Sequence, residues 1–258
     1  MMNAARDTWT MAKRSLRHIT RSVDTIITVV LMPIALMLLF VYVFGGAIGR
    51  QTGSVRYIDF IVPGIVVMTV VSGIAYAAVR LSLDLQSGMV NRFRTMPVAP
   101  SSILGGQALS STVSNLLSSA LVLVVAFAAG FRSSAGPVEW VIFAGLLLLF
   151  TLATTWMAMF FGLLAKTMEG AGAFSYILLL LVFVSPAFVP SSSIKPFLRG
   201  FAEDQPMTSI VESMRSLLVS GTAGPRIWAA IAWSVGILLA TYLLSITVYR
   251  RKTIVVTT

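Results

Sequence analysis

The sequence predicts an all-α polytopic membrane protein with six transmembrane helices. Long apolar runs alternate with short polar breaks, and no Asp, Glu, Lys or Arg falls inside a run. The composition agrees, because 57% of the residues are hydrophobic and only 11% are charged, against about 25% charged in an average soluble domain. The runs are residues 26–44, 60–79, 103–130, 140–165, 171–188 and 228–249. Each is near or above the roughly 20 residues that span a hydrocarbon core.

These runs are predicted to be helices and not strands of a barrel. A backbone in lipid must satisfy its own hydrogen bonds, so it spans as a helix or as part of a closed barrel. Barrel strands are about 10 residues long and alternate in polarity, and the runs do neither. We therefore interpret residues 1–258 as a single transmembrane domain. The lack of ionisable residues in the runs disfavours an ion-coupled carrier, because intramembrane carboxylates and histidines are the usual relays.

The segment before the first run, residues 1–25, carries an amphipathic pattern. Its apolar residues recur at helical spacing: Trp9, Ala12, Leu16, Ile19 and Val23. A basic row lies beside them: Lys13, Arg17 and Arg21. This pattern predicts an interfacial helix in the cytoplasmic headgroup layer, with Trp9 at its boundary. A plain basic segment that only directs topology is the alternative.

The basic residues predict the orientation. The formal net charge is +10, which resembles that of a nucleic-acid binder, but the charges lie in the breaks between apolar runs. If the N-terminus is cytoplasmic, 12 of the 19 Lys and Arg residues fall in inside segments and 7 in outside ones. The positive-inside rule therefore places both termini in the cytoplasm. We therefore expect these basic segments to lie against the lipid bilayer and not to bind a nucleic acid.

The break between the second and third runs predicts a short amphipathic helix after Arg80. Its apolar residues repeat every four positions: Leu81, Leu85, Met89 and Phe93. Pro97 and Pro100 end this pattern. Such a helix would lie at the membrane surface and present Asp84, Arg92 and Arg94 to the cytoplasm. A passive connector is the alternative.

The longest external break, residues 189–227, predicts two further short helices. One apolar set consists of Ile194, Phe197, Leu198 and Phe201. The other consists of Ile210, Val211, Met214, Leu217 and Leu218. Pro206 precedes the second set and is a good first-turn residue. We expect both helices to dip back toward the outer membrane face, with a surface-lying loop as the alternative.

Candidate path-lining residues lie within the runs. Gln107 and Asn115 share a helical face of the third run with several serines, while Tyr76 and Phe183 are aromatic residues that could contact an apolar substrate. Polar faces of this kind either line a path or form tight contacts between helices, and the sequence leaves both open.

The cytoplasmic break resembles the same region of the ABC-2-type permeases, in particular their daunorubicin-resistance-like branch. An acid, a glycine, a basic pair and a proline follow one another in that order: Asp84, Gly88, Arg92-Phe93-Arg94 and Pro97. The external break carries a second resemblance to this branch. It consists of Gln205-Pro206 followed by Glu212 and Arg215.

The resemblance implies a permease subunit that exports a hydrophobic or amphipathic drug, antibiotic or lipid from a bacterial cell through its inner membrane. It implies that the cytoplasmic motif couples to an ATPase, and that an external cap includes Phe197, Phe201, Pro206, Glu212 and Arg215. Export of a polysaccharide or glycolipid is the alternative within the family. An ion-coupled secondary carrier and a membrane-anchored scaffold are the alternatives outside it.

The chain lacks a nucleotide-binding loop of its own. A Walker A loop needs Gly-Lys before Ser or Thr, and the four lysines follow Ala, Ala, Ile and Arg. We expect no cofactor, no metal site and no catalytic residue here, so the chain alone is not an enzyme. The resemblance implies ATP and Mg²⁺ on a separate ABC ATPase subunit in two copies. It also implies a second copy of this permease or a close relative.

Overall fold

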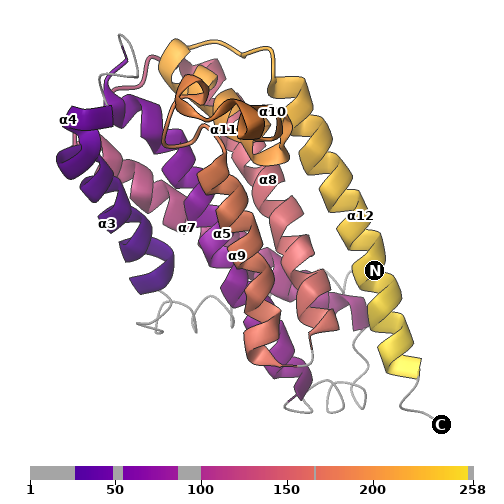
Figure 1. Ribbon diagram of the computed structural model, residues 1–258. Coiled ribbons are helices and arrows are strands. Elements are labelled where there is room, and N and C mark those ends of the chain that lie inside the picture. The colour runs from indigo at the N-terminus through magenta and orange to yellow at the C-terminus, as the bar shows by residue number, and fades with distance from the viewer. Residues whose placement is uncertain (1–26, 49–54, 87–99, 166, 255–258) are drawn as a thin grey trace.

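The computed structural model describes residues 27–48, 55–86, 100–165 and 167–254, and this part of the chain consists of helices and their connections, without strands (Figure 1). The predicted interfacial helix with Trp9, Lys13, Arg17 and Arg21 lies outside the described residues. So do Gly88, Arg92, Arg94 and Pro97 of the cytoplasmic motif.

Each of the six apolar runs lies largely in a helical segment. The first segment joins the π-helical turn η1 (Ile27–Leu31), α3 (Met32–Leu39), the π-helical turn η2 (Phe40–Phe44) and α4 (Gly45–Ile48). The others are α5 (Tyr57–Gln86), α7 (Pro100–Ala128), α8 (Pro137–Leu164), α9 (Met168–Val184) and α12 (Ile227–Ile254). The all-helical architecture is thus confirmed for the described residues.

Four of these helices are long and apolar enough to cross a membrane by length and composition. Their candidate spans are Tyr57–Asp84, Leu104–Ala128, Pro137–Leu164 and Ile227–Tyr249. The segments Val29–Phe44 and Met168–Val184 are apolar but shorter. The count of six crossings therefore stays a prediction.

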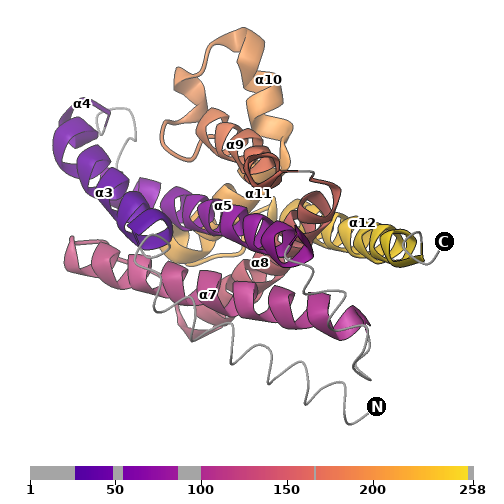
Figure 2. The same ribbon diagram turned by 90° about the horizontal axis from the view of Figure 1, so that it is seen from below.

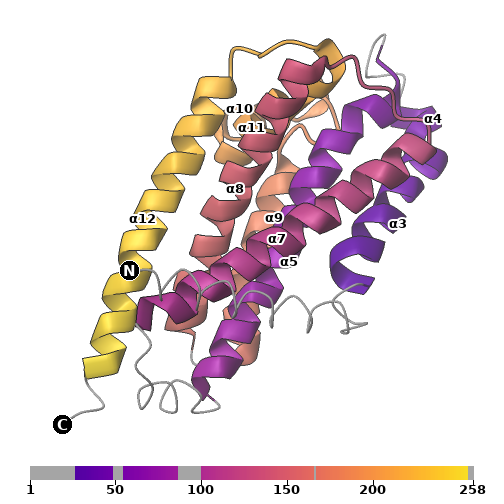
Figure 3. The same cartoon turned by 180° about the vertical axis from the view of Figure 1, so that it is seen from behind.

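Helix α5 is the centre of the bundle. It contacts α3, α7, α8 and α9, and Figures 2 and 3 show it between α7 on one side and α9 on the other. Of the most apolar stretch of 18 residues in α5, 94% is buried. A Cβ added at Gly162 of α8 would lie 2.8 Å from the backbone oxygen of Ala78 in α5, so this glycine permits close helix packing.

Proline marks several helix starts. Helices α8, α10 (Pro196–Asp204) and α11 (Pro206–Arg215) each begin with a proline, where the missing N–H would have no intrahelical acceptor anyway. Thr167 caps α9 by accepting a hydrogen bond from the backbone N–H of Gly170 at 3.1 Å. Pro206 therefore has the first-turn position that the sequence predicts.

The start of the predicted cytoplasmic helix belongs to α5. The sequence predicts that Arg80 ends the span and that a separate helix follows, but α5 continues without a break to Gln86. Asp84 is consequently half-buried on α5 and not displayed on a surface helix. The helix continues because its backbone hydrogen bonds do not depend on an apolar side chain at every position.

Two short helices follow α9, as predicted. We call α10, α11 and the π-helical turn η5 (Ser216–Ser220) the cap, and it lies at the end of the bundle where α5, α8 and α12 begin (Figure 1). Helix α11 packs against α5, α8, α9 and α12. Val211 and Met214 are fully buried, whereas Phe197 and Phe201 of α10 are 77% and 56% exposed.

Candidate functional site

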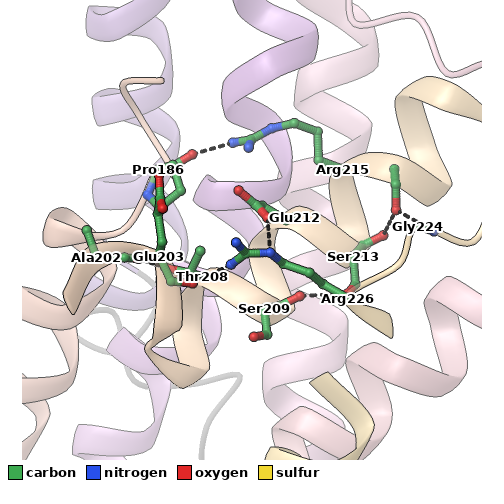
Figure 4. A network of polar contacts seen from close by, with 11 residues as sticks. Pro186, Ala202, Glu203, Thr208, Ser209, Glu212, Ser213, Arg215, Gly224 and Arg226 are labelled. Atoms are coloured by element: carbon green, nitrogen blue, oxygen red, sulfur yellow. Dashed lines mark hydrogen bonds and ion pairs between the residues drawn. The ribbon is translucent and has the colours of Figure 1, made fainter. Parts of the chain in front are cut away.

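Arg215 joins three parts of the structure at the cap end. Its Nε donates to the backbone oxygen of Phe60 in α5 at 3.0 Å. One terminal nitrogen donates to the oxygens of Pro186 at 2.7 Å and Ala187 at 3.2 Å, in the segment after α9. The guanidinium carbon also lies 3.8 Å from the centroid of the Phe60 ring, within cation–π range. Figure 4 shows the side chain reaching from α11 to Pro186.

The burial of Arg215 among these groups affects the pKa of its guanidinium. Burial lowers the pKa of its guanidinium to about 10, and the charge of nearby Glu212 acts in the opposite direction. Arg215 therefore stays protonated at neutral pH and donates to the carbonyl oxygens as a cation, which makes these hydrogen bonds stronger than neutral ones.

Side chains also satisfy other backbone oxygens near the end of α9. The oxygen of Leu181 accepts from the backbone N–H of Ser185 at 3.0 Å, whereas the carbonyls beyond the last turn of a helix need partners from outside it. Gln205, between α10 and α11, donates to the oxygen of Leu181 at 2.9 Å. The Tyr57 hydroxyl of α5 donates to the oxygen of Phe188 at 3.1 Å. Arg215 and Tyr57 thus fix the segment of residues 185–188 between α5 and the cap, and Gln205 attaches the end of α9 to the cap.

A second arginine, Arg226, binds to both helices of the cap. Arg226, just before α12, forms an ion pair with Glu212 of α11, with Nε 2.9 Å from Oε2. The same guanidinium donates to the backbone oxygen of Glu203 near the end of α10. Thr208 of α11 donates to the oxygen of Ala202. The two cap helices are thus tied to each other and to the start of α12 (Figure 4).

The connection between α7 and α8 is also attached to α5 and the cap. Asp59 pairs with Arg56 at 2.8 Å and accepts a hydrogen bond from the backbone N–H of Arg132 at 2.9 Å. Ser133 donates through its hydroxyl to the oxygen of Leu218 in η5 at 2.8 Å. Gly221 ends η5 with φ of 62°, and a Cβ there would lie 2.8 Å from the oxygen of Ser134, so glycine is required.

At the opposite end of α5, Asp84 faces α7. With the Gln107 amide turned so that its nitrogen faces the carboxylate, this nitrogen donates to Oδ2 of Asp84 at 3.2 Å. The Gln107 oxygen then accepts from the backbone N–H of Leu81 at 3.1 Å. Gln107 is buried. These two residues, predicted for coupling and for path lining respectively, therefore join the helices that flank the cytoplasmic break.

The other candidate path-lining residues lie on three different helices. Asn115 is buried on the side of α7 that faces Gly73 of α5, and its Nδ2 has no hydrogen-bond partner among the described residues. Tyr76 is half-buried on α5, and Phe183 is 47% exposed on α9. Path lining by these residues stays a prediction.

Sequence reasoning found part of the cap network. The family resemblance marks Glu212 and Arg215, and both take part in these contacts. Their role as an external cap stays a prediction. The resemblance includes Gln205 without naming a contact for it, and Tyr57 and Arg226 are not singled out, because their partners lie far away in the sequence. Arg226 had a usable signal, since it is a lone cation directly before an apolar run and needs a partner if the cap covers it.

Comparison with known proteins gives consistent matches. The profile of the ABC-2 type transporter family matches residues 6–219. The chain is 30% identical over 215 residues to the "Daunorubicin resistance ABC transporter permease protein DrrB1" of Streptomyces coeruleorubidus, which covers 83% of this chain and 72% of that protein. It is 22% identical over 239 residues to the "Probable doxorubicin resistance ABC transporter permease protein DrrC" of Mycobacterium tuberculosis, covering 91% of this chain and 86% of that protein.

Proposed function

Since this chain belongs to the ABC-2 type transporter family as a membrane permease, we propose that it exports a hydrophobic or amphipathic molecule, driven by ATP hydrolysis on a separate subunit. The observation that carries this proposal is the joint presence of an apolar helical bundle and a cap held by polar contacts in a chain of this family. Neither part supplies a nucleotide site, because no lysine follows a glycine in the sequence.

The proposed assembly has four chains. A permease of an ABC transporter works with an ATPase, and we propose two ATPase copies that hold ATP and Mg²⁺. A second copy of this permease or a close relative completes the assembly. Exposed apolar side chains on several helices support further contacts with lipid or protein, and they include Tyr176 and Leu180 on α9 and Trp228 and Leu239 on α12.

The proposed substrate is a drug, antibiotic or lipid-like molecule. The names of the similar proteins refer to resistance to daunorubicin and doxorubicin, and resistance is a usual consequence of export. The apolar character of the six runs also supports an amphipathic or lipid-like substrate. Export of a polysaccharide or glycolipid is the second candidate, because the family resemblance leaves the substrate class open.

The proposed orientation places both termini in the cytoplasm of a bacterial cell and the cap on the outer side of its inner membrane. The distribution of Lys and Arg supports it, with 12 against 7 on the two sides. In this orientation the break that contains Arg92 and Arg94 faces the ATPase.

Purification of the tagged permease from its native membrane tests the assembly. The proposal predicts that an ATPase with a Walker A loop co-purifies in a one-to-one ratio and that its activity rises in the complex. A permease that purifies without any such ATPase, under conditions where membrane complexes survive, would contradict the proposal.

A further inference from the structure

We propose that Arg215 is a positioning residue for transport, which joins α11 to the outer end of α5 and to residues 185–188 so that these parts move as one body. The inference rests on the proposed function and goes beyond it, because it names the contact through which motion of α5 reaches the cap.

The contacts of Arg215 converge on segments that are distant in sequence. Its acceptors are the oxygens of Phe60 in α5 and of Pro186 and Ala187 after α9. Loss of the guanidinium would remove a charged donor from all three oxygens at once. An unsatisfied buried polar group costs more than a hydrogen bond gains, which makes a single structural arrangement strongly preferred.

The chemistry of the contact favours arginine over lysine. The guanidinium has several donors in a fixed planar fork and stacks on aromatic rings, whereas an ammonium is a compact and strongly hydrated charge. Arg215 uses both properties, since it donates from two nitrogens and lies over the ring of Phe60. A lysine here would keep the charge but could not reproduce all of these contacts.

Two further contacts hold the same segments together. Tyr57 of α5 donates to the oxygen of Phe188. Gly64 of α5 lies so close to Ala187 that an added Cβ would be 2.8 Å from the Ala187 Cβ. The segment of residues 185–188 is therefore packed directly on α5 beside the bonds that Arg215 makes.

Helix α5 extends from the cap to the opposite end of the bundle. It is continuous from Tyr57 to Gln86, which at about 1.5 Å per residue corresponds to roughly 45 Å. Its far end carries Asp84 beside Gln107, next to the break that is predicted to contact the ATPase. A tilt of α5 that starts at this end would move α11 directly, because Arg215 fixes α11 to the other end.

The contact between Arg215 and residues 185–188 can be tested without nucleotide. Ala187 is fully buried, and the sequence has no cysteine, so the single variant Ala187→Cys reports opening of the contact through its reaction with an impermeant thiol reagent. We expect slow labelling in the otherwise unchanged chain and at least roughly tenfold faster labelling when Arg215→Gln is added, the effect of losing one charge-assisted hydrogen bond. Arg132→Gln is the matched control, since it removes a cation from an exposed side chain at the same end.

This first test is independent of transport. Equal labelling of Ala187→Cys with and without the added Arg215→Gln substitution would overturn the inference while leaving the proposed function untouched. Equal acceleration by Arg132→Gln would also overturn it, because the effect would then reflect charge and not the contact.

The role in transport is tested in the complete complex of permease and ATPase in vesicles. The measured quantity is the amount of a fluorescent amphipathic drug exported per ATP hydrolysed by the assembled complex. We expect Arg215→Lys and Arg215→Gln to lower this ratio while ATP hydrolysis continues, with the larger loss for Gln, and Arg132→Gln to leave it unchanged. Arg215→Lys keeps the test decisive if the Gln variant does not fold. If assembled complexes of either variant keep the normal ratio and only their amount falls, the role is structural and the inference is wrong.

Discussion

Arg215 of α11 lies over the ring of Phe60 in α5, which is 155 positions earlier in the sequence, and donates to the backbone oxygen of the same residue. A cation, an aromatic face and a carbonyl thereby meet at one point, where the cap contacts the start of α5. Helix α11 of the cap is consequently packed on the helical bundle.

The close packing of α8 on α5 gives a stability prediction. A Cβ at Gly162 would lie 2.8 Å from the Ala78 oxygen and 3.2 Å from its Cα, both backbone atoms that cannot turn away. Gly162→Ala should therefore lower stability, because overpacking costs about 1–3 kcal/mol and outweighs the roughly 1 kcal/mol that alanine gains over glycine in a helix.

Gly145 of the same helix provides the control. A Cβ there meets nothing within 4 Å, so Gly145→Ala should leave the thermal unfolding midpoint in detergent unchanged or raise it. An equal midpoint for the two variants would contradict the close contact between α8 and α5.

Reversing the charge of the predicted ATPase contact should uncouple the transporter. Arg92 and Arg94 belong to the cytoplasmic motif, and single exposed ion pairs contribute only about 0–1 kcal/mol. The double variant Arg92→Glu with Arg94→Glu replaces attraction by repulsion, so it should abolish stimulation of the ATPase and export in vesicles. Arg132→Glu with Lys195→Glu is the control at the cap end, where both side chains are exposed. Normal stimulation by the first variant would mean that this motif does not contact the ATPase.

The cap has an exposed helix and a buried one, and labelling should separate them. In single-cysteine variants, Val211→Cys and Met214→Cys should react slowly with an impermeant thiol reagent both in detergent and in membranes, because both positions are fully buried within the chain. Phe197→Cys and Phe201→Cys should react quickly in detergent and slowly in membranes, because about 25 cal/mol per Å² disfavours leaving their apolar surface in water.

Ser192 is the reference for this experiment, since it is exposed and polar. If Phe197→Cys reacts as fast as Ser192→Cys in membranes, α10 lies in water and does not re-enter the outer leaflet. If Met214→Cys reacts quickly, position 214 is accessible to water and α11 does not pack on the bundle as described.

The sequence predicts the helices well because lipid imposes length and polarity on each run. Each apolar run lies largely in a helical segment, and Pro206 begins α11 as expected. The helix ends are less predictable, since α5 continues to Gln86 beyond its apolar run and thereby takes Asp84 into the bundle. The backbone hydrogen bonds of a helix continue past the end of an apolar run, so the hydropathy of the sequence does not mark where the helix ends.

The contacts of the cap are hardly predictable from sequence. The family resemblance marks Glu212 and Arg215 on α11, yet Glu212 pairs with Arg226 and Arg215 binds backbone oxygens. Carbonyl groups occur at every residue, so nothing in the sequence marks Pro186 or Ala187 as acceptors. The exposure of Phe197 depends on how α10 sits on the bundle, which a local pattern does not determine.

The energy source of transport tests the central claim most directly. The permease and its ATPase are placed together in vesicles, and export of a fluorescent amphipathic drug is followed with ATP present and the proton and sodium gradients collapsed. We predict that export continues under these conditions and stops when ATP is withheld or cannot be hydrolysed. Export that stops with the gradients while ATP remains high would contradict the account and would identify an ion-coupled carrier.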